Sequence, residues 1–451
     1  MIAMESMFVA LSTPWGRSAI AIIRCSGFGC LSLCESIFSL KPEPRRTYAK
    51  VYRSADGLIL DNVIMVYYRA PKSYTGLDML EISSHGNPLI IQKILEDLCH
   101  RGCRLAEPGE FTKTAFFNGK MDLVQAEAVA DVIHSQSESA LRIANGQLTG
   151  SLGVEIAGIW EQLVRIMAQL EVAIDFSEDE PFALDEYRIM DELGAPLDRL
   201  SQLESTARYR PILQLGVRTV IIGPPNVGKS SLLNGLLGQE RALVSPIAGT
   251  TRDFLEESIS VGKWNLRIVD TAGLHSTAND LEQLGMRRSR EKLEIADFVL
   301  LVFDGSQALP NLDHFDWETF EQKKGLILLN KRDIFTLPDW PHMPLPWEII
   351  PISALNPKDI TGLKNRICQE LEAKRIVPDD LPCVVNLRQS ACLREAIHGI
   401  EMAQILLQKK IIPELVAAEL NLVLKSLEKI LGRNANEDIL NQIFSQFCIG
   451  K

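Results

Sequence analysis

The sequence predicts three structural parts: an α/β module with a parallel, doubly wound sheet, inserted into an all-α helical domain, with an α+β domain before both. Three observations lead to this fold class. Short apolar runs alternate with helical segments between about Val217 and Lys374. Apolar residues recur at helical spacing on both sides of that stretch, from Asp122 onward and again after Leu381. Before about Lys120, strand-like runs alternate with turns.

Local patterns place the elements and the boundaries. In the N-terminal part we expect strands at 19–24 and 63–68 and a helix at 88–100, and farther on the acidic stretch 177–192 reads as a solvated loop that runs into a helix. Two or more long helices should follow Asp122, and helices should return after Leu381. The predicted domains are 1–120, 121–212, 213–378 and 379–451, of which the second and fourth form the helical domain.

Composition limits the class of protein. A chain of 451 residues exceeds what one core usually organises, and 46% hydrophobic with 23% charged residues is typical of a globular protein. The net charge of −11 argues against a surface coated for nucleic acid, although it averages over domains and leaves a local basic patch open. No apolar run approaches the roughly 20 residues that span a bilayer, and residues 1–29 lack the order of a signal peptide. We therefore expect a cytoplasmic protein without a membrane anchor.

The nine cysteines are odd in number, and the closest pairs are Cys30 with Cys34 and Cys99 with Cys103. Four residues apart on a helix, two thiols share a face and could hold a metal. The interpretation that we favour is small buried hydrophobic side chains in a reducing compartment.

A phosphate-binding loop follows the predicted strand 217–222. Gly223-Pro-Pro-Asn-Val-Gly228-Lys229-Ser230 satisfies GxxxxGK[ST] between a strand and a helix. The loop amides and the helix N-terminus face phosphates, Lys229 reaches the β/γ-phosphates, and the Ser230 hydroxyl can ligate Mg²⁺. The residues assigned to nucleotide binding here are Asn226, Val227, Gly228, Lys229, Ser230 and Ser231.

Further boxes follow in order, each after a predicted strand. In the box Asp270-Thr271-Ala272-Gly273, the Asp270 carboxylate would hold Mg²⁺ through water, and Gly273 would lie beside the γ-phosphate. The box Asn330-Lys331-Arg332-Asp333 resembles the guanine-recognition element of GTPases, in which the Asp333 carboxylate accepts hydrogen bonds from N1–H and the 2-amino group. Adenine offers neither donor. Ser353, Ala354 and Leu355 resemble the backbone element that closes over the base.

A mobile switch is expected between the first two strands of the module. Thr251 is the candidate second Mg²⁺ ligand, gained with the γ-phosphate and lost on hydrolysis. Leu274 stands where many small GTPases carry the glutamine that positions the attacking water. Either hydrolysis is weak, or another residue and a cation take the place of that glutamine. The loop residues assigned to the nucleotide are Ser245, Pro246, Ile247, Ala248, Gly249, Thr250 and Thr251.

These motifs together resemble the MnmE (TrmE) family of tRNA-modification GTPases, within the TrmE-Era-Era-like P-loop superfamily. The resemblance rests on GPPNVGKSS, GTTRD, DTAGL without glutamine and the terminal Cys-Ile-Gly-Lys. It extends to Ser73-Tyr-Thr-Gly, His85-Gly, Glu107-Pro-Gly-Glu-Phe-Thr and the segment 118–128. The match therefore covers essentially the whole chain.

The resemblance implies a fold and an activity. The fold is a P-loop GTPase domain inserted into a helical domain, after an N-terminal domain like those that bind tetrahydrofolate. The family's members are homodimers through that domain and form a heterotetrameric or larger complex with an FAD-containing partner called GidA. They install an aminomethyl or carboxymethylaminomethyl group at carbon 5 of the wobble uridine of certain tRNAs. The chemistry consumes GTP, gives GDP, and uses a one-carbon unit of 5-formyltetrahydrofolate or a related folate.

The resemblance also assigns residues. It implies a K⁺ site at Asn226 with Ser245, Ile247 and Thr250, where the cation replaces an arginine finger, and a water-positioning acid at Glu282. It assigns folate contacts to Arg24, Glu81, Lys120 and Lys451. Cys448 becomes a functional thiol, with a plain structural thiol as the alternative.

This chain departs from the family at a few positions. His275 replaces the common arginine after the DTAGL motif, Trp15 and Ser18 replace proline and glycine, and GLD replaces GED at 76–78. Two other functions share the nucleotide motifs: a ribosome-assembly GTPase of the Era or Der kind, and a non-enzymatic GTP switch. Neither a KH-like basic segment nor a second P-loop is present in the sequence.

Overall fold

The structure is a computed structural model that describes residues 6–175, 186–238, 257–269, 293–307, 317–334, 344–373, 376–378, 381–434 and 436–451. The chain divides into two compact units. The first comprises Met1–Ala130, Gln147–Gln202 and Arg388–Lys451, and the second comprises Asp131–Gly146 and Leu203–Leu387. The first unit therefore contains three separate segments of the sequence.

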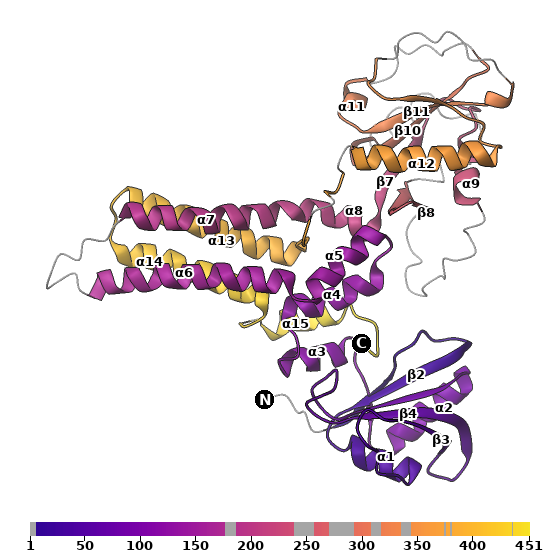
Figure 1. Ribbon diagram of the computed structural model, residues 1–451, viewed down its shortest axis with the longest axis vertical. Coiled ribbons are helices and arrows are strands. Elements are labelled where there is room, and N and C mark those ends of the chain that lie inside the picture. Colours follow the sequence, from indigo (N-terminus) through magenta and orange to yellow (C-terminus); the bar gives the residue numbers. More distant parts are fainter. Residues whose placement is uncertain are drawn as a thin grey trace. The chain divides into compact units, whose positions relative to one another are not determined.

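The N-terminal part of the first unit is an α+β domain (Figure 1). Its sheet has the order β3-β4-β5-β2-β1-β6, antiparallel except between β1 and β6. The expected helix at 88–100 is confirmed as α2, with Asn87 as its cap and Pro88 at its first turn. Helices α1 and α3 were not predicted. The elements are β1 (Phe8–Leu11), β2 (Ser18–Ser26), α1 (Cys30–Phe38), β3 (Thr47–Arg53), β4 (Ile59–Tyr68), β5 (Met79–Gly86), α2 (Pro88–His100), β6 (Arg104–Leu105) and α3 (Glu110–Phe117).

One face of this sheet and the helices α1 and α2 form a core. Alternate residues of the strands, such as Ile23, Met65 and Ile82, are fully buried and belong to one cluster with Cys34 of α1 and Ile94 of α2. Cys30 and Cys34 are both fully buried on α1, so they serve as small hydrophobic side chains there.

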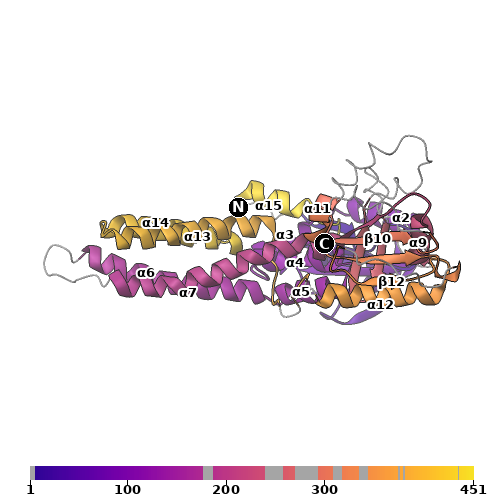
Figure 2. The ribbon, with the colours of Figure 1, turned by 90° about the horizontal axis from the view of Figure 1, so that it is seen from above.

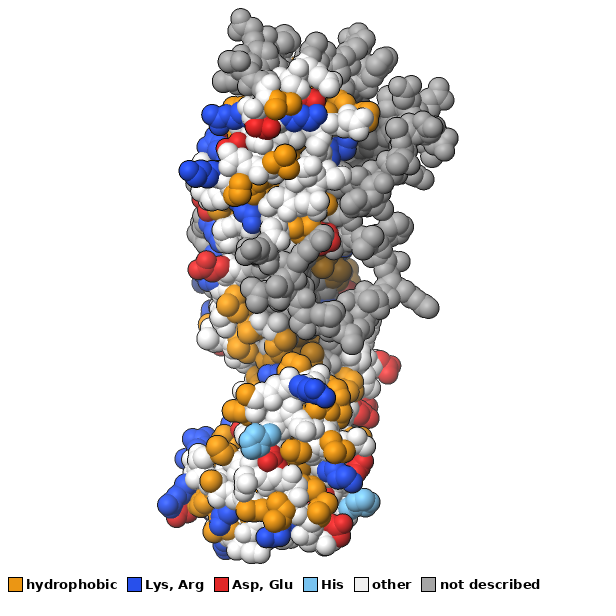
Figure 3. Space-filling model, turned by 90° about the vertical axis from the view of Figure 1, so that its right-hand side faces the viewer, with side chains coloured by type: hydrophobic (Ala, Val, Ile, Leu, Met, Phe, Trp, Pro, Cys, Tyr) orange, Lys and Arg blue, Asp and Glu red, His pale blue; other side chains and the backbone are white. Residues whose placement is uncertain are grey.

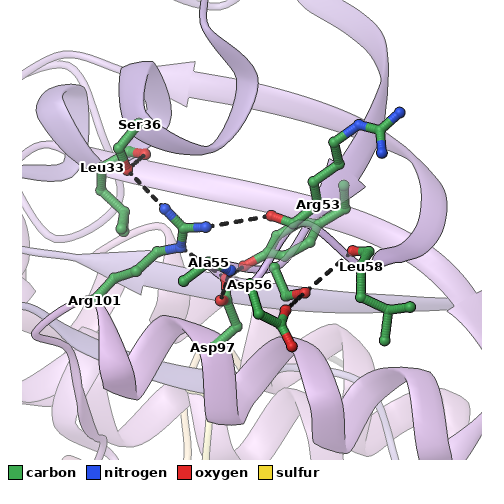
Figure 4. Close-up of polar contacts among 10 residues, drawn as sticks. Leu33, Ser36, Arg53, Ala55, Asp56, Leu58, Asp97 and Arg101 are labelled. Atoms are coloured by element: carbon green, nitrogen blue, oxygen red, sulfur yellow. Dashed lines mark hydrogen bonds and ion pairs between the residues drawn. The ribbon is translucent and has the colours of Figure 1, made fainter.

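A buried carboxylate joins the helices to the turn between β3 and β4 (Figure 4). Asp97 of α2 is 5% exposed and accepts hydrogen bonds from Tyr52 Oη at 2.8 Å, Ala55 N at 2.7 Å and Arg101 Nε at 2.7 Å. Arg101 also donates to Ser36 Oγ of α1 at 3.3 Å. Because the buried charge is fully paired, this cluster stabilises the domain.

The helical part of the first unit draws on two distant segments. In two perpendicular views, α6 and α7 lie alongside α13 and α14 (Figures 1 and 2). Their apolar positions repeat at helical spacing: α6 buries Leu152, Ile156, Leu163 and Leu170, and α14 buries residues such as Leu420. The helices of these two segments are α4 (Leu123–His134), α5 (Glu138–Leu148), α6 (Ser151–Asp175), α7 (Glu186–Ser205), α13 (Leu387–Gln408), α14 (Pro413–Leu431) and α15 (Glu437–Phe444). Within them, residues 131–146, 203–205 and 387 belong to the second unit.

The second unit contains a six-stranded sheet of the order β12-β11-β10-β7-β9-β8. Strands β10 and β11 are buried at every residue, as expected for parallel strands covered on both faces. The expected doubly wound sheet is present, except that edge strand β8 is antiparallel to β9. The elements are α8 (Arg210–Leu215), β7 (Val217–Ile222), α9 (Lys229–Leu237), β8 (Glu257–Val261), β9 (Trp264–Ile268), β10 (Phe298–Asp304), α11 (Trp317–Glu321), β11 (Gly325–Asn330), β12 (Ile349–Pro351) and α12 (Pro357–Ala373), with 3₁₀ turns at Thr206–Tyr209 and Arg332–Ile334.

Candidate functional site

The phosphate loop lies at the carboxyl end of β7, which is one of the two central strands of the sheet in the second unit. Gly228 has φ +94°, and a Cβ there would lie 2.2 Å from Asn330 Nδ2. Only glycine therefore fits this position. Lys229 begins α9, and its Nζ donates to Gly223 O at 2.9 Å and Pro224 O at 2.7 Å, so the ammonium lies within the loop that it is expected to serve.

The guanine box is held to the phosphate loop by one buried amide. Asn330, the last residue of β11, is 2% exposed. Its Nδ2 donates to Val227 O at 2.8 Å, and its Oδ1 accepts from Ala354 N at 2.9 Å. Asn330 thus joins three of the predicted boxes by direct hydrogen bonds.

Lys331, two residues before the exposed Asp333, is fixed to the end of a neighbouring strand. Lys331 has φ +71°, and its Nζ lies 2.6 Å from Asp304 Oδ2 at the end of β10. Burial raises the pKa of Asp304, but the Lys331 ammonium and the Ser306 hydroxyl outweigh it and hold that pKa below its usual value. Asp333 lies on the 3₁₀ turn, where its carboxylate is accessible to a ligand.

The third box, 353–355, is fixed through its backbone. Ser353 N donates to Asp359 Oδ2 at 2.8 Å, and Arg332 N donates to Ile352 O at 3.0 Å. Leu355 is 79% exposed beside these fixed groups. This backbone anchoring is what a segment that contacts a base through main-chain groups requires.

The remaining predicted nucleotide residues lie outside the described part of the chain. These are Glu282, Ser245, Pro246, Ile247, Ala248, Gly249, Thr250, Thr251, Asp270, Thr271, Ala272 and Gly273, together with Leu274 and His275. We call the phosphate loop and the guanine box, which Asn330 joins, the cradle. Within it, Gly228 and Asn226 (φ +62°) have positive φ and Asp333 is exposed, as the predicted nucleotide site requires. Ser230 follows Lys229 on α9, where a Mg²⁺ ligand of this motif belongs.

The predicted folate residues gather in the first unit, around paired strands β2 and β5. Arg24 is opposite Glu81 in the register, and Arg24 Nε lies 2.7 Å from Glu81 Oε1. Tyr68 Oη donates to Glu81 Oε2 at 3.2 Å. Arg24 and Glu81 therefore form an ion pair with each other. A ligand that contacts them must either bind to the intact ion pair or break it.

The C-terminus reaches the end of β1, the strand that pairs with β2. Ser12 Oγ donates to Gly450 O at 3.1 Å, and a Cβ on Gly450, which has φ +89°, would lie 2.3 Å from Leu11 O. Burial and the nearby Arg24 guanidinium lower the pKa of Lys451. Cys448 is exposed and free. Residues 24, 81, 448 and 451 thus come together from opposite ends of the chain.

Lys120, the fourth predicted folate contact, lies at the edge of this group. Its exposed Nζ donates to Pro71 O at 3.1 Å. The sequence reasoning missed Tyr68 and Ser12, which the structure adds to this region. Strand alternation could have placed Tyr68 on the face of Glu81, but no local signal pairs Ser12 with a residue 438 positions away.

Comparison with known families and proteins identifies relatives over the full length. The profile of the MnmE helical domain matches residues 123–448, and that of the GTP-binding protein TrmE N-terminus matches residues 7–120. The tRNA modification GTPase MnmE of Opitutus terrae is 42% identical, covering 99% of each chain. That of Aquifex aeolicus is 38% identical over 99% of this chain and 100% of its own. Among the described residues, no helix is long and apolar enough to cross a membrane.

Proposed function

This chain belongs to the MnmE family of tRNA modification GTPases and is a GTP-hydrolysing enzyme, and we propose that it modifies carbon 5 of the wobble uridine of certain tRNAs together with a GidA-type FAD protein. The observation that carries the proposal is the coexistence of two sites in one chain. One is the cradle joined by Asn330, and the other is the cluster of Arg24, Glu81 and Lys451 at the N-terminal sheet.

In the nucleotide site, Lys229 and the amides of the phosphate loop bind the phosphates, and Asp333 selects guanine. Ser230, Thr251 and Asp270 are the proposed Mg²⁺ ligands, directly or through water, and Mg²⁺ would offset phosphate charge. Asn226, Ser245, Ile247 and Thr250 are proposed to hold K⁺, which would offset charge that develops on the phosphates. The positive-φ backbone of Asn226 supports this assignment, because it turns the loop sharply there.

Glu282 is the proposed water-positioning residue. Leu274 has no group that can orient a water, so the carboxylate must come from elsewhere in the chain. The other residues that we propose to bind the nucleotide are Ser231, the loop 245–251, the box 270–273, Asn330, Lys331 and the segment 353–355.

In the N-terminal site, Arg24, Lys120 and Lys451 are proposed to bind folate carboxylates, and Glu81 the pterin ring. A tetrahydrofolate bound there would supply the one-carbon unit. Burial and the Arg24 guanidinium lower the pKa of Lys451, and a carboxylate bound between these two cations would offset their repulsion, which supports an anion site. Cys448, exposed three residues before Lys451, is the proposed functional thiol.

The working assembly that we propose is a homodimer through domain 1–120, bound to the FAD protein. The helical domain comprises 121–212 and 379–451, and 213–378 is the G domain. Both MnmE relatives named above match along nearly their whole length, which supports the same division of roles. The cytoplasm is the compartment that holds tRNA and reduced thiols together.

Mass spectrometry of wobble nucleosides tests this function. Cells that lack the gene should lose the carbon-5 aminomethyl or carboxymethylaminomethyl nucleosides and regain them with the native gene. Complementation with the Lys229→Ala variant, which lacks the phosphate-binding ammonium, should fail. Unchanged wobble nucleosides in the deleted strain would overturn the proposal.

A further inference from the structure

The N-terminal domain of this acidic protein carries a small net positive charge, because it holds fewer acidic residues than the rest of the chain. Residues 1–120 carry fourteen Lys and Arg against eleven Asp and Glu, whereas the rest of the chain carries 33 against 47. Figure 3 shows one face of this domain at the lower end of the view, with Lys and Arg side chains among hydrophobic ones. The net charge of −11 is therefore the sum of +3 on residues 1–120 and −14 on the rest of the chain.

Four of these cations lie around one loop, 69–73, which follows β4. We call Arg45, Arg46, Arg69 and Lys72 the loop patch; all four are exposed. Arg45 Nη2 donates to Lys72 O at 3.0 Å, and Lys72 N donates to Arg69 O at 2.9 Å. These bonds bring residues 45, 69 and 72 together on the surface.

The loop is fixed rather than loosely attached. Ala70 N donates to Asp78 Oδ1 at 2.8 Å, and Arg45 N donates to Tyr67 O at 2.7 Å. Asn118 Nδ2 donates to Thr75 O at 2.7 Å, which holds the segment after the loop to the turn that carries Lys120. The backbone of such a loop loses little conformational freedom when its cations bind a ligand.

Most of the patch charge is uncompensated. Arg46 pairs with the exposed Glu43 at 3.0 Å and lies over the Tyr48 ring at 5.6 Å. In the part of the chain that the structure describes, no ion pair involves Arg45, Arg69 or Lys72. Charges without a carboxylate partner remain available to an anionic ligand.

The patch borders the proposed one-carbon site. Pro71, inside the loop, accepts the hydrogen bond from Lys120, and Tyr68, one residue before the loop, donates to Glu81. A uridine that reacts there must bring the phosphates of its neighbouring nucleotides to the surface beside it. The exposed cations of the loop patch lie at that surface, beside Lys120.

We propose that the loop patch binds backbone phosphates of the tRNA anticodon loop and so positions the wobble uridine at the N-terminal site. The inference rests on the proposed function. Phosphate contacts of this kind fix the position of the RNA without reading its sequence. The adjoining Tyr48, with Arg46 over its ring, offers a face for an unstacked base.

The test compares two full-length variants of equal charge change. Arg69→Glu/Lys72→Glu alters the patch, and Lys93→Glu/Lys425→Glu alters two exposed lysines on α2 and α14. Binding of a tRNA transcript with uridine at the wobble position is measured by fluorescence anisotropy over a series of KCl concentrations. The patch variant should bind at least about tenfold more weakly, and the slope of log K against log [salt] should shrink by about 1.5. The control variant should show a much smaller change in affinity and in salt slope. In both variants, the rate of GTP hydrolysis without tRNA should equal that of the native protein.

Each failure has its own signature. If the native chain binds this tRNA but the patch variant keeps native affinity and salt slope, the inference is overturned while the function stands. If the patch variant loses affinity for 5-formyltetrahydrofolate and keeps native tRNA binding, the patch serves the folate and the inference is again overturned. Failure of the proposed function appears instead as unchanged wobble nucleosides in the deleted strain.

Discussion

Arg388 forms a two-pronged ion pair with Glu127, a residue 261 positions earlier in the chain. Arg388 Nε lies 2.9 Å from Glu127 Oε1, and Nη2 lies 2.9 Å from Oε2. The same guanidinium donates to Lys429 O at the end of α14, and Gln389 Nε2 donates to Glu127 at 2.6 Å. One carboxylate therefore joins α4 to the first turn of α13.

Glu127→Gln should destabilise the first unit by about 3–5 kcal/mol, because it leaves a largely buried guanidinium without its counter-charge. Urea denaturation followed by circular dichroism measures this loss. Glu395→Gln, which removes an exposed partner of Lys429, should cost less than about 1 kcal/mol and is the matched control. Equal losses in the two variants would contradict the role assigned to Glu127.

Asn330→Ala should weaken GTP binding, because Val227 O and Ala354 N lose their shared partner. Two buried groups left unpaired cost about 1–3 kcal/mol each. Asn330→Asp keeps the acceptor for Ala354 N but loses the donor to Val227 O. Its nucleotide affinity should therefore lie between that of the native protein and that of the Asn330→Ala variant. Titration calorimetry with GDP gives the three affinities, and an Asp variant equal to Ala would argue against two separable bonds.

Asp333→Asn should lower GTP affinity by about 3 kcal/mol, or ~100-fold, because the amide replaces an ionised acceptor of two hydrogen bonds. The new NH₂ group can donate to the 2-oxo group of xanthine, so affinity for xanthosine triphosphate should rise. Competition with a fluorescent guanine nucleotide measures both changes. Loss of GTP binding with no gain for the xanthine nucleotide would place Asp333 outside the base site.

GTP turnover should be faster in KCl than in NaCl at equal ionic strength, since the proposed site at Asn226 replaces an arginine finger. Glu282→Gln should slow turnover by about 10²-fold or more while GTP affinity stays near native. Phosphate release under single-turnover conditions separates the two effects. Equal rates in both salts would count against a K⁺-dependent mechanism.

Cys448→Ser should leave GTP hydrolysis intact and abolish wobble modification, because we propose the thiol as a group of the N-terminal site and not of the nucleotide site. Cys368→Ser, in α12 of the G domain, should preserve both activities and serves as the control. Nucleoside analysis and phosphate release are the two readouts. Retention of both activities in the Cys448 variant would reduce it to a structural thiol.

Sequence periodicity located most of the fold for a physical reason: buried faces repeat with the geometry of the element. Strand β7 and helix α2 coincide with the expected ranges, and the fold class is confirmed. The short helix α1 was missed, because its apolar residues lie between strands without a long repeat. The antiparallel edge strand β8 was missed because local spacing does not encode strand direction.

The candidate sites divide in the same way. Contiguous motifs such as 223–230 and 330–333 can be recognised in the sequence, because a loop that binds a nucleotide needs particular residues at fixed spacing. Pairings such as Arg24 with Glu81, or Ser12 with Gly450, depend on tertiary folding and have no local pattern. The folate roles came from family resemblance, and the structure contributes the proximity of the residues.

One buried hydrogen bond bears on how this architecture could arise. Thr206 Oγ1 accepts from Val385 N at 3.2 Å, so the two ends of the second unit's long segment meet across 179 residues. Because the two ends of this module touch, the module can replace a tight turn of the helical domain. Its insertion therefore adds little to the entropy cost of bringing the flanking helices together. Such a module can be exchanged for another domain, or replaced by a short linker, while the helices on either side stay connected. The Thr206–Val385 contact marks where the cut would fall.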